Sequence, residues 1–277
     1  LSVEKGEVRG VIGPNGSGKS TLFNMISGVY LPEPGARIVF DGAEITGRPS
    51  HEIAHRGIAR TFQMLRIFSG MSVIENMLVG HHPHVSYGAA SAVIGTRGVW
   101  REERRLKAEM MELLSFIGLA DYAEMPAGEM SGGQRRLLAL GRAMAARPKL
   151  LMLDEPGAGL SPTNVDILLD TVLALQKRFG LTVIIIEHIL KLVMDTCQRV
   201  TVLDHGEKIA EGTPGEIREN PRVIEAYLGK EMKDEEVRAF MRSKRCRLQQ
   251  GARRHAGDQG PRRRLRLRSD PERRVAP

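Results

Sequence analysis

Short apolar runs alternate along the chain with longer stretches in which apolar residues recur every three or four positions. The runs Val8–Ile12, Leu150–Leu153 and Thr182–Ile186 predict strands, and the last two are almost entirely apolar, as in strands buried on both faces of a sheet. A helix is predicted between them, starting at Ser161-Pro162 and ending at Gly180. Strands that alternate with helices predict an α/β domain with a mainly parallel sheet.

Two smaller hairpins are predicted beside this sheet. Arg37–Phe40 runs into an Asp41-Gly42 turn, which favours a small antiparallel β arm. Near residue 200, two apolar runs flank the turn Asp204-His205-Gly206 and predict a final hairpin. Short helices are expected after it, at Pro214–Glu219 and Pro221–Leu228. The sheet is therefore expected to be mixed.

The middle of the chain has helical rather than strand periodicity. Apolar residues recur at helical spacing between Arg101 and Gly118, namely at Leu106, Met110, Leu113, Leu114 and Ile117. We interpret residues 72–147 as a helical subdomain, inserted between residues 1–71 and residues 148–229. The stripe of Leu and Met residues is then the core of that subdomain.

Composition excludes several classes of protein. Of the 277 residues, 42% are hydrophobic and 27% are charged, which is ordinary for a folded globular chain. The apolar runs are too short to cross a bilayer, and the chain does not start like a secretory signal. Two cysteines, Cys197 and Cys246, cannot form a disulfide scaffold, and we interpret both as reduced cytosolic thiols.

The net charge of +8 arises from the C-terminal residues of the chain. Residues 231–277 contain 15 basic and 7 acidic residues, which is the whole excess, and residues 1–230 are balanced with 26 of each. This basic tail, counted from residue 230, has few apolar residues and no aromatic residue after Phe240, which is typical of disorder. Anionic lipid or RNA are alternative partners for it, although RNA binding would lack stacking platforms.

The strongest chemical signal is a phosphate-binding loop between the first predicted strand and the first predicted helix. It fits the pattern G-x-x-x-x-G-K-S/T and consists of Gly13, Pro14, Asn15, Gly16, Ser17, Gly18, Lys19, Ser20 and Thr21. Glycines let backbone N–H groups converge on phosphate oxygens at a helix N-terminus. Lys19 can reach the β- and γ-phosphates of a nucleotide, and the Ser20 hydroxyl can bind Mg²⁺. ATP and Mg²⁺ are therefore the expected ligands.

Two carboxylates follow the predicted strand at Leu150–Leu153. Asp154 can approach a metal ion beside the phosphates, and Glu155 can orient or deprotonate the attacking water. A positioned base of this kind contributes ~10²–10⁴ in rate. An Asp-Glu pair after a strand is by itself the ordinary start of a polar loop, so the phosphate loop is what favours the catalytic interpretation.

A third motif, Ser131-Gly132-Gly133-Gln134, allows two interpretations. Ser131 and Gln134 have the spacing of a capping box for the helix that follows. A glycine-rich helix N-terminus can also bind a phosphate. Two single residues complete the set of candidates. Gln63 would by itself be interpreted as a surface amide, and His188 follows the predicted strand that ends near Glu187.

Along the chain, the five motifs follow the order phosphate loop, Gln63, Ser131–Gln134, Asp154-Glu155 and His188. This order resembles the ATP-binding subunit of an ABC transporter, and the resemblance covers about residues 1–229. Three softer motifs resemble the subunits of branched-chain amino-acid importers, and a urea importer's subunit is similar. These motifs are Arg60-Thr-Phe-Gln63, Ser72-Val-Ile-Glu-Asn76 and the stretch from Gly212-Thr-Pro to Asn220-Pro-Arg-Val-Ile-Glu-Ala-Tyr-Leu-Gly229. The implied fold is the ABC-type P-loop nucleotide-binding domain, which is α/β with a mixed sheet, a small antiparallel arm and a helical subdomain.

The resemblance also implies how the motifs work together. Two ATP-binding subunits, identical or different, would form a head-to-tail dimer with two ATP molecules at the interface. Ser131, Gly132, Gly133 and Gln134 of one subunit would close over ATP on the loop of the other. Glu155 would be the catalytic carboxylate, His188 would touch the γ-phosphate, and Gln63 would sense Mg²⁺, which Ser20 and Asp154 also hold. Residues 157–161 would couple the two sites.

Further partners implied by the resemblance are membrane permease subunits and, indirectly, a periplasmic or extracellular substrate-binding protein. The expected location is peripheral, on the cytoplasmic face of the inner membrane.

The chain departs from the family pattern in four places. Met130 replaces the usual leucine, a volume-conserving change, and Ile189 stands where an aspartate commonly follows the histidine. The chain begins at Leu1, 12 residues before Gly13, so the upstream hairpin that usually stacks on adenine is absent from this sequence and a truncated start is expected. The basic tail is the fourth departure.

Two other hypotheses compete with the transporter ATPase. The basic tail would suit a soluble ABC-type ATPase that acts on nucleic acid or ribosomes, but the balanced charge of residues 1–230 and the single nucleotide domain argue against it. The missing hairpin would suit an inactive relative that only binds partners. ATP hydrolysis that energises an importer remains the main prediction.

Overall fold

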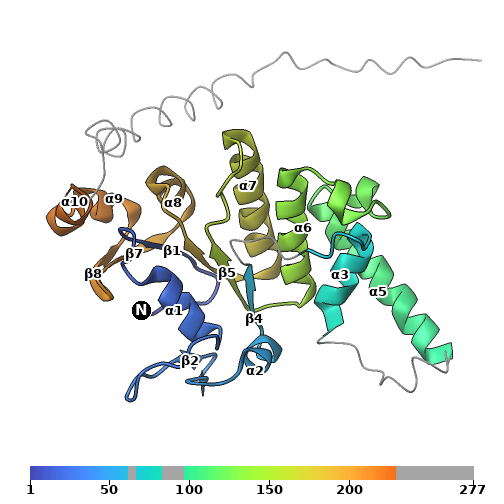
Figure 1. Ribbon diagram of the computed structural model, residues 1–277, viewed down its shortest axis with the longest axis horizontal. Coiled ribbons are helices and arrows are strands. Elements are labelled where there is room, and N and C mark those ends of the chain that lie inside the picture. The colour runs from blue at the N-terminus through green and yellow to red at the C-terminus, as the bar shows by residue number, and fades with distance from the viewer. Residues whose placement is uncertain (62–66, 83–96, 229–277) are drawn as a thin grey trace, which may run out of the picture. The chain divides into compact units, whose positions relative to one another are not determined.

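The strands predicted from the apolar runs lie at the centre of a six-stranded sheet in the computed structural model (Figure 1). The structure describes residues 1–61, 67–82 and 97–228, so Gln63 and the basic tail lie outside the described residues. The strands follow the order β4-β5-β6-β1-β7-β8. They are β1 (Val8–Ile12), β4 (Ile58–Thr61), β5 (Leu150–Asp154), β6 (Thr182–Ile186), β7 (Arg199–Asp204) and β8 (Glu207–Gly212).

The pairing of the strands confirms the predicted mixed sheet. Neighbouring strands from β4 to β7 run parallel, and only β8 pairs antiparallel, with β7. Every residue of β1, β5 and β6 is buried, as expected for parallel strands covered on both faces. The predicted arm is also present as a two-stranded antiparallel sheet of β2 (Val39–Phe40) and β3 (Ala43–Glu44).

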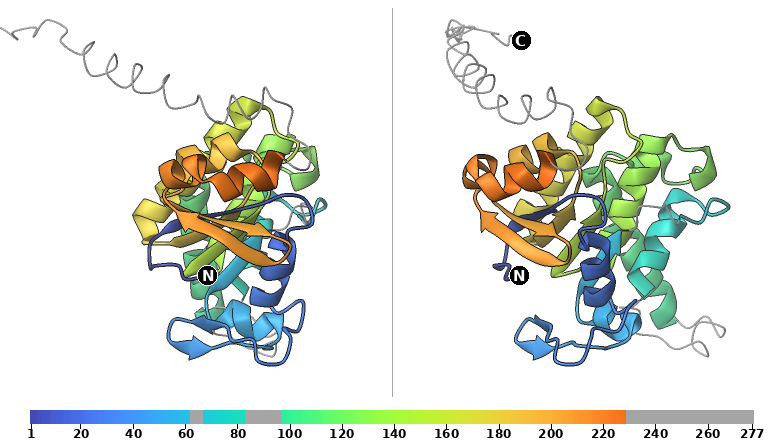
Figure 2. Two further views of the ribbon diagram at one scale, coloured as in Figure 1. Left: turned by 90° about the vertical axis from the view of Figure 1, so that its left-hand side faces the viewer. Right: turned by 60° about the vertical axis from the view of Figure 1, so that its left-hand side comes forward.

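Helices cover both faces of the six-stranded sheet (Figure 2). On one face, Phe23 of α1 (Lys19–Ile26) and Ile53 of α2 (Ser50–His55) share a buried cluster with Met152 and Ile184 of the sheet. On the other face lie α7 (Pro162–Phe179) and α8 (Leu190–Thr196). A β-carbon on Gly10 would come within 2.3 Å of Val193, so this glycine lets α8 pack directly on β1.

Helices also fill the described part of residues 72–147. They are α3 (Val73–His81), α5 (Arg97–Phe116), the short 3-10 helices η2 (Ala120–Tyr122) and η3 (Ala127–Glu129), and α6 (Gly132–Ala145). The predicted stripe is mostly buried, because Leu106, Met110, Leu114 and Ile117 are at most 4% exposed and Leu113 is half-buried. Two short helices, α9 (Pro214–Glu219) and α10 (Pro221–Leu228), follow β8 as predicted. Among the described residues, no helix has the length and hydropathy needed to span a membrane.

The strand β4 is not predicted from the sequence. Its residues are Ile58-Ala-Arg-Thr, and the charged Arg60 among them is partly buried. A charged residue at this place interrupts the apolar pattern from which the other strands are predicted. Pairing with β5 stabilises the strand, since Ile58 to Thr61 lie opposite Leu150 to Leu153.

A buried arginine connects three strands across the sheet. Arg9 of β1 is 2% exposed, and its Nε donates a hydrogen bond to Glu7 Oε1 at 2.7 Å. Its Nη1 donates to the carboxylate of Glu211 on β8 and to Thr201 Oγ1 on β7. Glu211 also accepts a hydrogen bond from Lys208 Nζ at 2.7 Å. Because a buried charge is stable only when paired, these bonds fix the position of β8 relative to β1.

This network predicts a loss of stability in acid. The hydrogen bonds from Lys208 and Arg9 lower the pKa of Glu211 from 4.5 to about 2. A carboxylate whose pKa is depressed by folding stabilises the fold fully above about pH 4.5, and this stabilisation is lost as the pH falls toward 2. We expect the urea midpoint to drop between about pH 5 and pH 3, and the drop to be smaller in Glu211→Gln, which starts from a lower midpoint.

A matched control is Glu124→Gln, whose partner Lys107 forms an exposed ion pair with it. Exposed pairs contribute little, so this variant should follow the wild-type dependence on pH. If Glu211→Gln loses as much stability between these pH values as the wild type does, the role of Glu211 is contradicted.

Candidate functional site

The phosphate loop joins β1 to α1, and its glycines have positive φ angles that other residues rarely adopt. Gly13 has φ of 156°, and a β-carbon there would lie 2.1 Å from the carbonyl oxygen of Leu203 and 2.6 Å from Ser17 Oγ. Gly18, with φ of 95°, occupies the N-cap of α1 and offers no side chain to the helix N–H groups. These N–H groups can therefore bind an anion, as the glycine-rich sequence predicts.

The Lys19 side chain lies inside the phosphate loop. Its ammonium group donates hydrogen bonds to the carbonyl oxygens of Gly13 and Pro14, both at 2.9 Å, and to Ser17 Oγ at 3.2 Å. Burial lowers the pKa of Lys19, and the charges of Glu155 and Asp154 oppose that shift. The fold therefore brings the ammonium group close to the carboxylates of Asp154 and Glu155 at the end of β5, although more than 130 positions separate them from Lys19 in the sequence.

A later segment supports this loop in a way that is not predicted from the sequence. In the turn between β7 and β8, Gly206 N donates a hydrogen bond to the carbonyl oxygen of Ser17 at 3.1 Å. Burial raises the pKa of Tyr227 on α10, and its hydroxyl oxygen makes no hydrogen bond within the described part of the chain. The turn signal Asp204-His205-Gly206 is visible in the sequence, but its contact with residue 17 is not.

Asp154 and Glu155 differ in their surroundings. Asp154, the last residue of β5, is 7% exposed, and its Oδ2 accepts a hydrogen bond from Arg60 Nη2 at 2.7 Å. Glu155 is partly exposed and has φ of 46°, which is the left-handed region. A conformation of this kind costs ~1–3 kcal/mol for a residue other than glycine. It is maintained because Glu155 N donates to Ile186 O at 2.9 Å and Glu155 O accepts from Ala158 N at 3.1 Å.

The oxygen donors near the loop fit a magnesium ion that is bound together with phosphates. Mg²⁺ prefers oxygen ligands, retains several waters, and takes one or two protein groups in addition to phosphate oxygens. Ser20 is an exposed hydroxyl in the first turn of α1, and Asp154 supplies a carboxylate. In the part of the chain that the structure describes, no group of three His, Cys, Asp or Glu residues is suited to hold a metal by itself. Gln63, the third predicted ligand, lies outside the described residues.

The Ser-Gly-Gly-Gln motif forms the predicted capping box at the start of α6. Ser131 Oγ accepts from Gln134 N at 3.3 Å, and Gln134 Oε1 accepts from Ser131 N at 2.9 Å. Ser131 and Gly132 are exposed, and Gly133 lies against Asn164, since a β-carbon there would be 3.0 Å from that side chain. Figure 1 shows α6 and α1 apart along the sheet, so one chain does not bring this motif to its own phosphate loop.

Residues 157–161 are held from two sides. Gly157 N donates to Glu187 Oε1 at 2.8 Å, and Arg136 of α6 donates from Nη2 to the carbonyl oxygen of Ala158 at 2.7 Å. Glu187 is completely buried, and this burial raises its pKa. Neither Arg136 nor Glu187 is among the site residues predicted from the sequence. Glu187 follows an apolar strand directly, and this position is the sequence signal that could have identified it.

His188 extends this arrangement toward the surface. Its side chain is 54% exposed, and its Nδ1 lies 3.7 Å from Glu187 Oε2. Ile189 is the N-cap of α8, and no side chain there bonds to the helix. Isoleucine stands here at a position that is commonly aspartate, so a side-chain cap is lacking.

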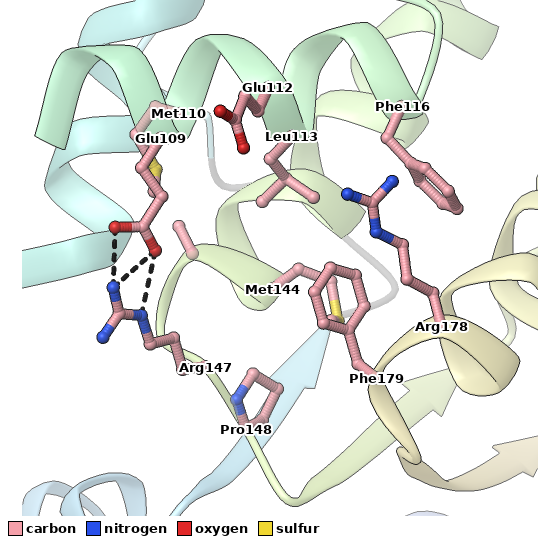
Figure 3. Close-up of a pocket in the computed structure, with 11 residues that line it drawn as sticks. Glu109, Met110, Glu112, Leu113, Phe116, Met144, Arg147, Pro148, Arg178 and Phe179 are labelled. Atoms are coloured by element: carbon pink, nitrogen blue, oxygen red, sulfur yellow. Dashed lines mark hydrogen bonds and ion pairs between the residues drawn. The ribbon is translucent and has the colours of Figure 1, made fainter. Parts of the chain in front are cut away.

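A separate cavity of about 520 Å³ lies between α5, the end of α6 and the end of α7 (Figure 3). Figure 3 shows Glu109 and Arg147 paired at one side of it and Arg178 near Phe116 at the other. The residues that line it include none of the predicted site residues. The cavity is therefore not part of the nucleotide site.

Comparison with protein families gives two matches. Residues 1–158 match the ABC transporter family. Residues 207–233 match the family described as branched-chain amino acid ATP-binding cassette transporter.

Curated proteins and solved structures agree with these matches. The chain is 42% identical over 229 residues to a high-affinity branched-chain amino acid transport ATP-binding protein of Pseudomonas aeruginosa, with coverage of 83% of this chain and 89% of that one. It is 40% identical over 223 residues to the equivalent protein of Escherichia coli, covering 80% and 87%. A crystal structure of an ATP-binding cassette of an ABC transporter in its ADP conformation superposes with a TM-score of 0.71 at 36% identity, covering 83% of this chain and 91% of that one.

Proposed function

Because this chain belongs to the ABC transporter family of ATP-binding proteins, we propose that it is the ATPase subunit that energises an importer of branched-chain amino acids. It binds ATP and couples its hydrolysis to transport. The observation that carries this proposal is the position of the Lys19 ammonium group, inside the phosphate loop and acted on by the charges of Glu155 and Asp154. The match of residues 207–233 supports the branched-chain substrate class.

The residues of the phosphate loop bind and orient the nucleotide. Backbone N–H groups of the phosphate loop, which Pro14 lacks, donate hydrogen bonds to the phosphate oxygens, and Lys19 neutralises charge on the β- and γ-phosphates. Ser20 and Asp154, together with Gln63, would hold Mg²⁺, which lowers the charge that develops on the transferred phosphoryl group. The loop packs closely against the carbonyl oxygen of Leu203 at Gly13, and Ser17 O accepts a hydrogen bond from Gly206 N of the β7–β8 turn, so neighbouring backbone orients the binding groups.

The chemical step is an in-line attack of water on the γ-phosphorus. Glu155 orients the water and accepts its proton as the new P–O bond forms and the bond to the β-γ bridging oxygen breaks. ADP and inorganic phosphate are the products. His188 contacts the γ-phosphate, and its neighbour Glu187 connects it to residues 157–161. Through this connection, the presence of a γ-phosphate in one ATP site can affect the other ATP site of the dimer.

Hydrolysis requires a second subunit. Ser131 and Gly132 are exposed and lie away from the phosphate loop of their own chain, so they can close over ATP only on a partner. The partner is a second ABC ATPase subunit, identical or different. Residues 1–71 and 148–229 form the catalytic lobe, residues 72–147 the helical subdomain, and residues 230–277 a basic tail.

A membrane-associated peripheral location and permease partners follow from the family. We place the subunit on the cytoplasmic face of the inner membrane, with a substrate-binding protein acting indirectly from the other side.

The test of the proposed function is ATP hydrolysis by the complete transporter. The full chain, its permease subunits and the substrate-binding protein are assembled in lipid vesicles, and phosphate release is measured with different solutes. We expect leucine, isoleucine or valine to stimulate hydrolysis and to accumulate in the vesicles in an ATP-dependent way. Stimulation by urea and not by these amino acids would contradict the proposed substrate class.

The Ser-Gly-Gly-Gln motif at residues 131–134 gives a prediction with a closely matched control. Replacement of Ser131 by arginine should abolish hydrolysis by the complete transporter, because a bulky cation cannot close over the partner's ATP. Nucleotide affinity of the isolated chain should stay within about twofold of wild type, since the motif does not contact its own phosphate loop. Phosphate release and fluorescent-nucleotide binding measure the two effects.

The control is Ser72→Arg. Ser72 caps α3 with the same capping box, in which its Oγ accepts from Glu75 N at 3.3 Å. Both variants therefore lose a helix cap, worth ~1 kcal/mol. The two-site arrangement is refuted if Ser72→Arg and Ser131→Arg impair hydrolysis equally, because loss of the cap then explains the effect.

A further inference from the structure

Arg60 is the one charged residue of β4, and it forms a buried ion pair with Asp154 of β5. Arg60 Nη2 and Asp154 Oδ2 are 2.7 Å apart, and the two side chains are 8% and 10% exposed. The pair lies at the ends of two neighbouring parallel strands, the edge of an α/β sheet at which ligands bind. A carboxylate with one oxygen bonded to arginine has little freedom to rotate.

The other half of the same guanidinium group contacts α1. Arg60 Nη1 donates to Asn24 Oδ1 at 2.7 Å and to Ser27 Oγ at 3.0 Å. Its carbon Cζ also lies 5.5 Å from the centre of the Phe23 ring. The group therefore bridges the helix that begins with Lys19 and Ser20 to the strand that ends with Asp154. A planar fork can make these bonds together, and an ammonium group cannot.

We propose that Arg60 is a positioning residue that orients the Asp154 carboxylate toward a divalent cation bound with the nucleotide. Arg60 binds Oδ2 of Asp154 and thereby presents the other oxygen, Oδ1, in a fixed direction. Because α1 carries the phosphate loop residues and Arg60 is anchored on α1, the carboxylate and the loop move as one unit. Groups that orient metal ligands in this way change metal affinity when they are removed. This inference rests on the proposed function.

The test measures binding of Mn²⁺, a spectroscopic substitute for Mg²⁺, to the full chain by electron paramagnetic resonance in the presence of ATP. We expect Arg60→Lys and Arg60→Met to weaken Mn²⁺ binding by at least about tenfold. Affinity for ATP in the presence of a metal chelator should stay within about twofold of wild type, because Lys19 and the loop N–H groups bind the phosphates. The control is Arg48→Lys, which changes an exposed arginine paired with Glu52 at 2.9 Å and should leave both affinities unchanged.

Arg60→Lys separates positioning from simple charge balance. Wild-type Mn²⁺ affinity in this variant would overturn the proposal, because the positive charge alone would then suffice. Loss of metal-free ATP affinity equal to the loss of Mn²⁺ affinity would also overturn it, because the damage would then be general.

If the Arg60 variants do not fold, Asn24→Ala decides the question. It removes one anchor of Arg60 without leaving a buried charge unpaired, and we expect it to weaken Mn²⁺ binding by at least about threefold. Unchanged binding in Asn24→Ala would overturn the proposal. If the wild type shows no ATP-dependent Mn²⁺ binding, the proposed function itself fails.

Discussion

Replacing Glu155 by glutamine is expected to leave ATP bound and to lower turnover of the complete transporter by ~10²–10⁴-fold. Glutamine has the same size and can keep the left-handed backbone of this position, where φ is 46°. It cannot accept a proton from the attacking water. Binding should persist, since the loop and Lys19 bind the phosphates, and loss of the negative charge of Glu155 near Lys19 does not weaken their attraction to an anion. Phosphate release and equilibrium nucleotide binding measure the two effects.

The matched control for this change is Glu112→Gln on α5. Glu112 is exposed and lines the separate cavity shown in Figure 3, away from the phosphate loop. Its replacement should leave turnover unchanged. If Glu155→Gln keeps at least half of the wild-type turnover, Glu155 does not act as the base, and another group must orient the water.

Replacing Gly13 by alanine is expected to abolish ATP binding. The added β-carbon would lie 2.1 Å from the carbonyl oxygen of Leu203 and 2.6 Å from Ser17 Oγ. The first of these is backbone of β7 and cannot rotate away, so the loop must move as a whole. We expect a melting temperature lower by at least about 5 °C, together with loss of fluorescent-nucleotide binding.

Gly16→Ala separates the steric effect from backbone strain. Gly16 also has a positive φ, of 79°, but a β-carbon there would meet no atom within 4 Å. This change should cost only the ~1–2 kcal/mol of a left-handed alanine and should retain measurable ATP binding. Equal effects of the two substitutions would show that the contact with Leu203 does not fix the loop.

Features that depend on residues close together in the sequence were predicted from it. Three central strands, the helix from Ser161 to Gly180 and the phosphate loop lie where the pattern places them. The capping box of Ser131 and Gln134 is formed by the predicted pair of bonds. Each of these features is determined by residues fewer than about twenty positions apart, through apolar periodicity, capping or turn chemistry.

Features that depend on strand order were not predicted. Arg60 lies in a strand whose pattern is broken by its own charge, and its partner Asp154 is identified only when β4 and β5 are known to be neighbours. Glu187 and Arg136 are likewise ordinary residues in the sequence. They become relevant because they hold Gly157 and Ala158 from opposite sides.

The sequence by itself determined the class of ligand, since a glycine-rich loop followed by Lys19 and Ser20 can bind polyphosphate wherever the loop lies. It also determined which residues carry the charges of the site. Only the tertiary structure decided which charges face each other: Lys19 with Glu155 and Asp154, and Asp154 with Arg60. The physical reason is that Coulomb and hydrogen-bond energies depend on distance in space, and the order of strands in the sheet sets that distance.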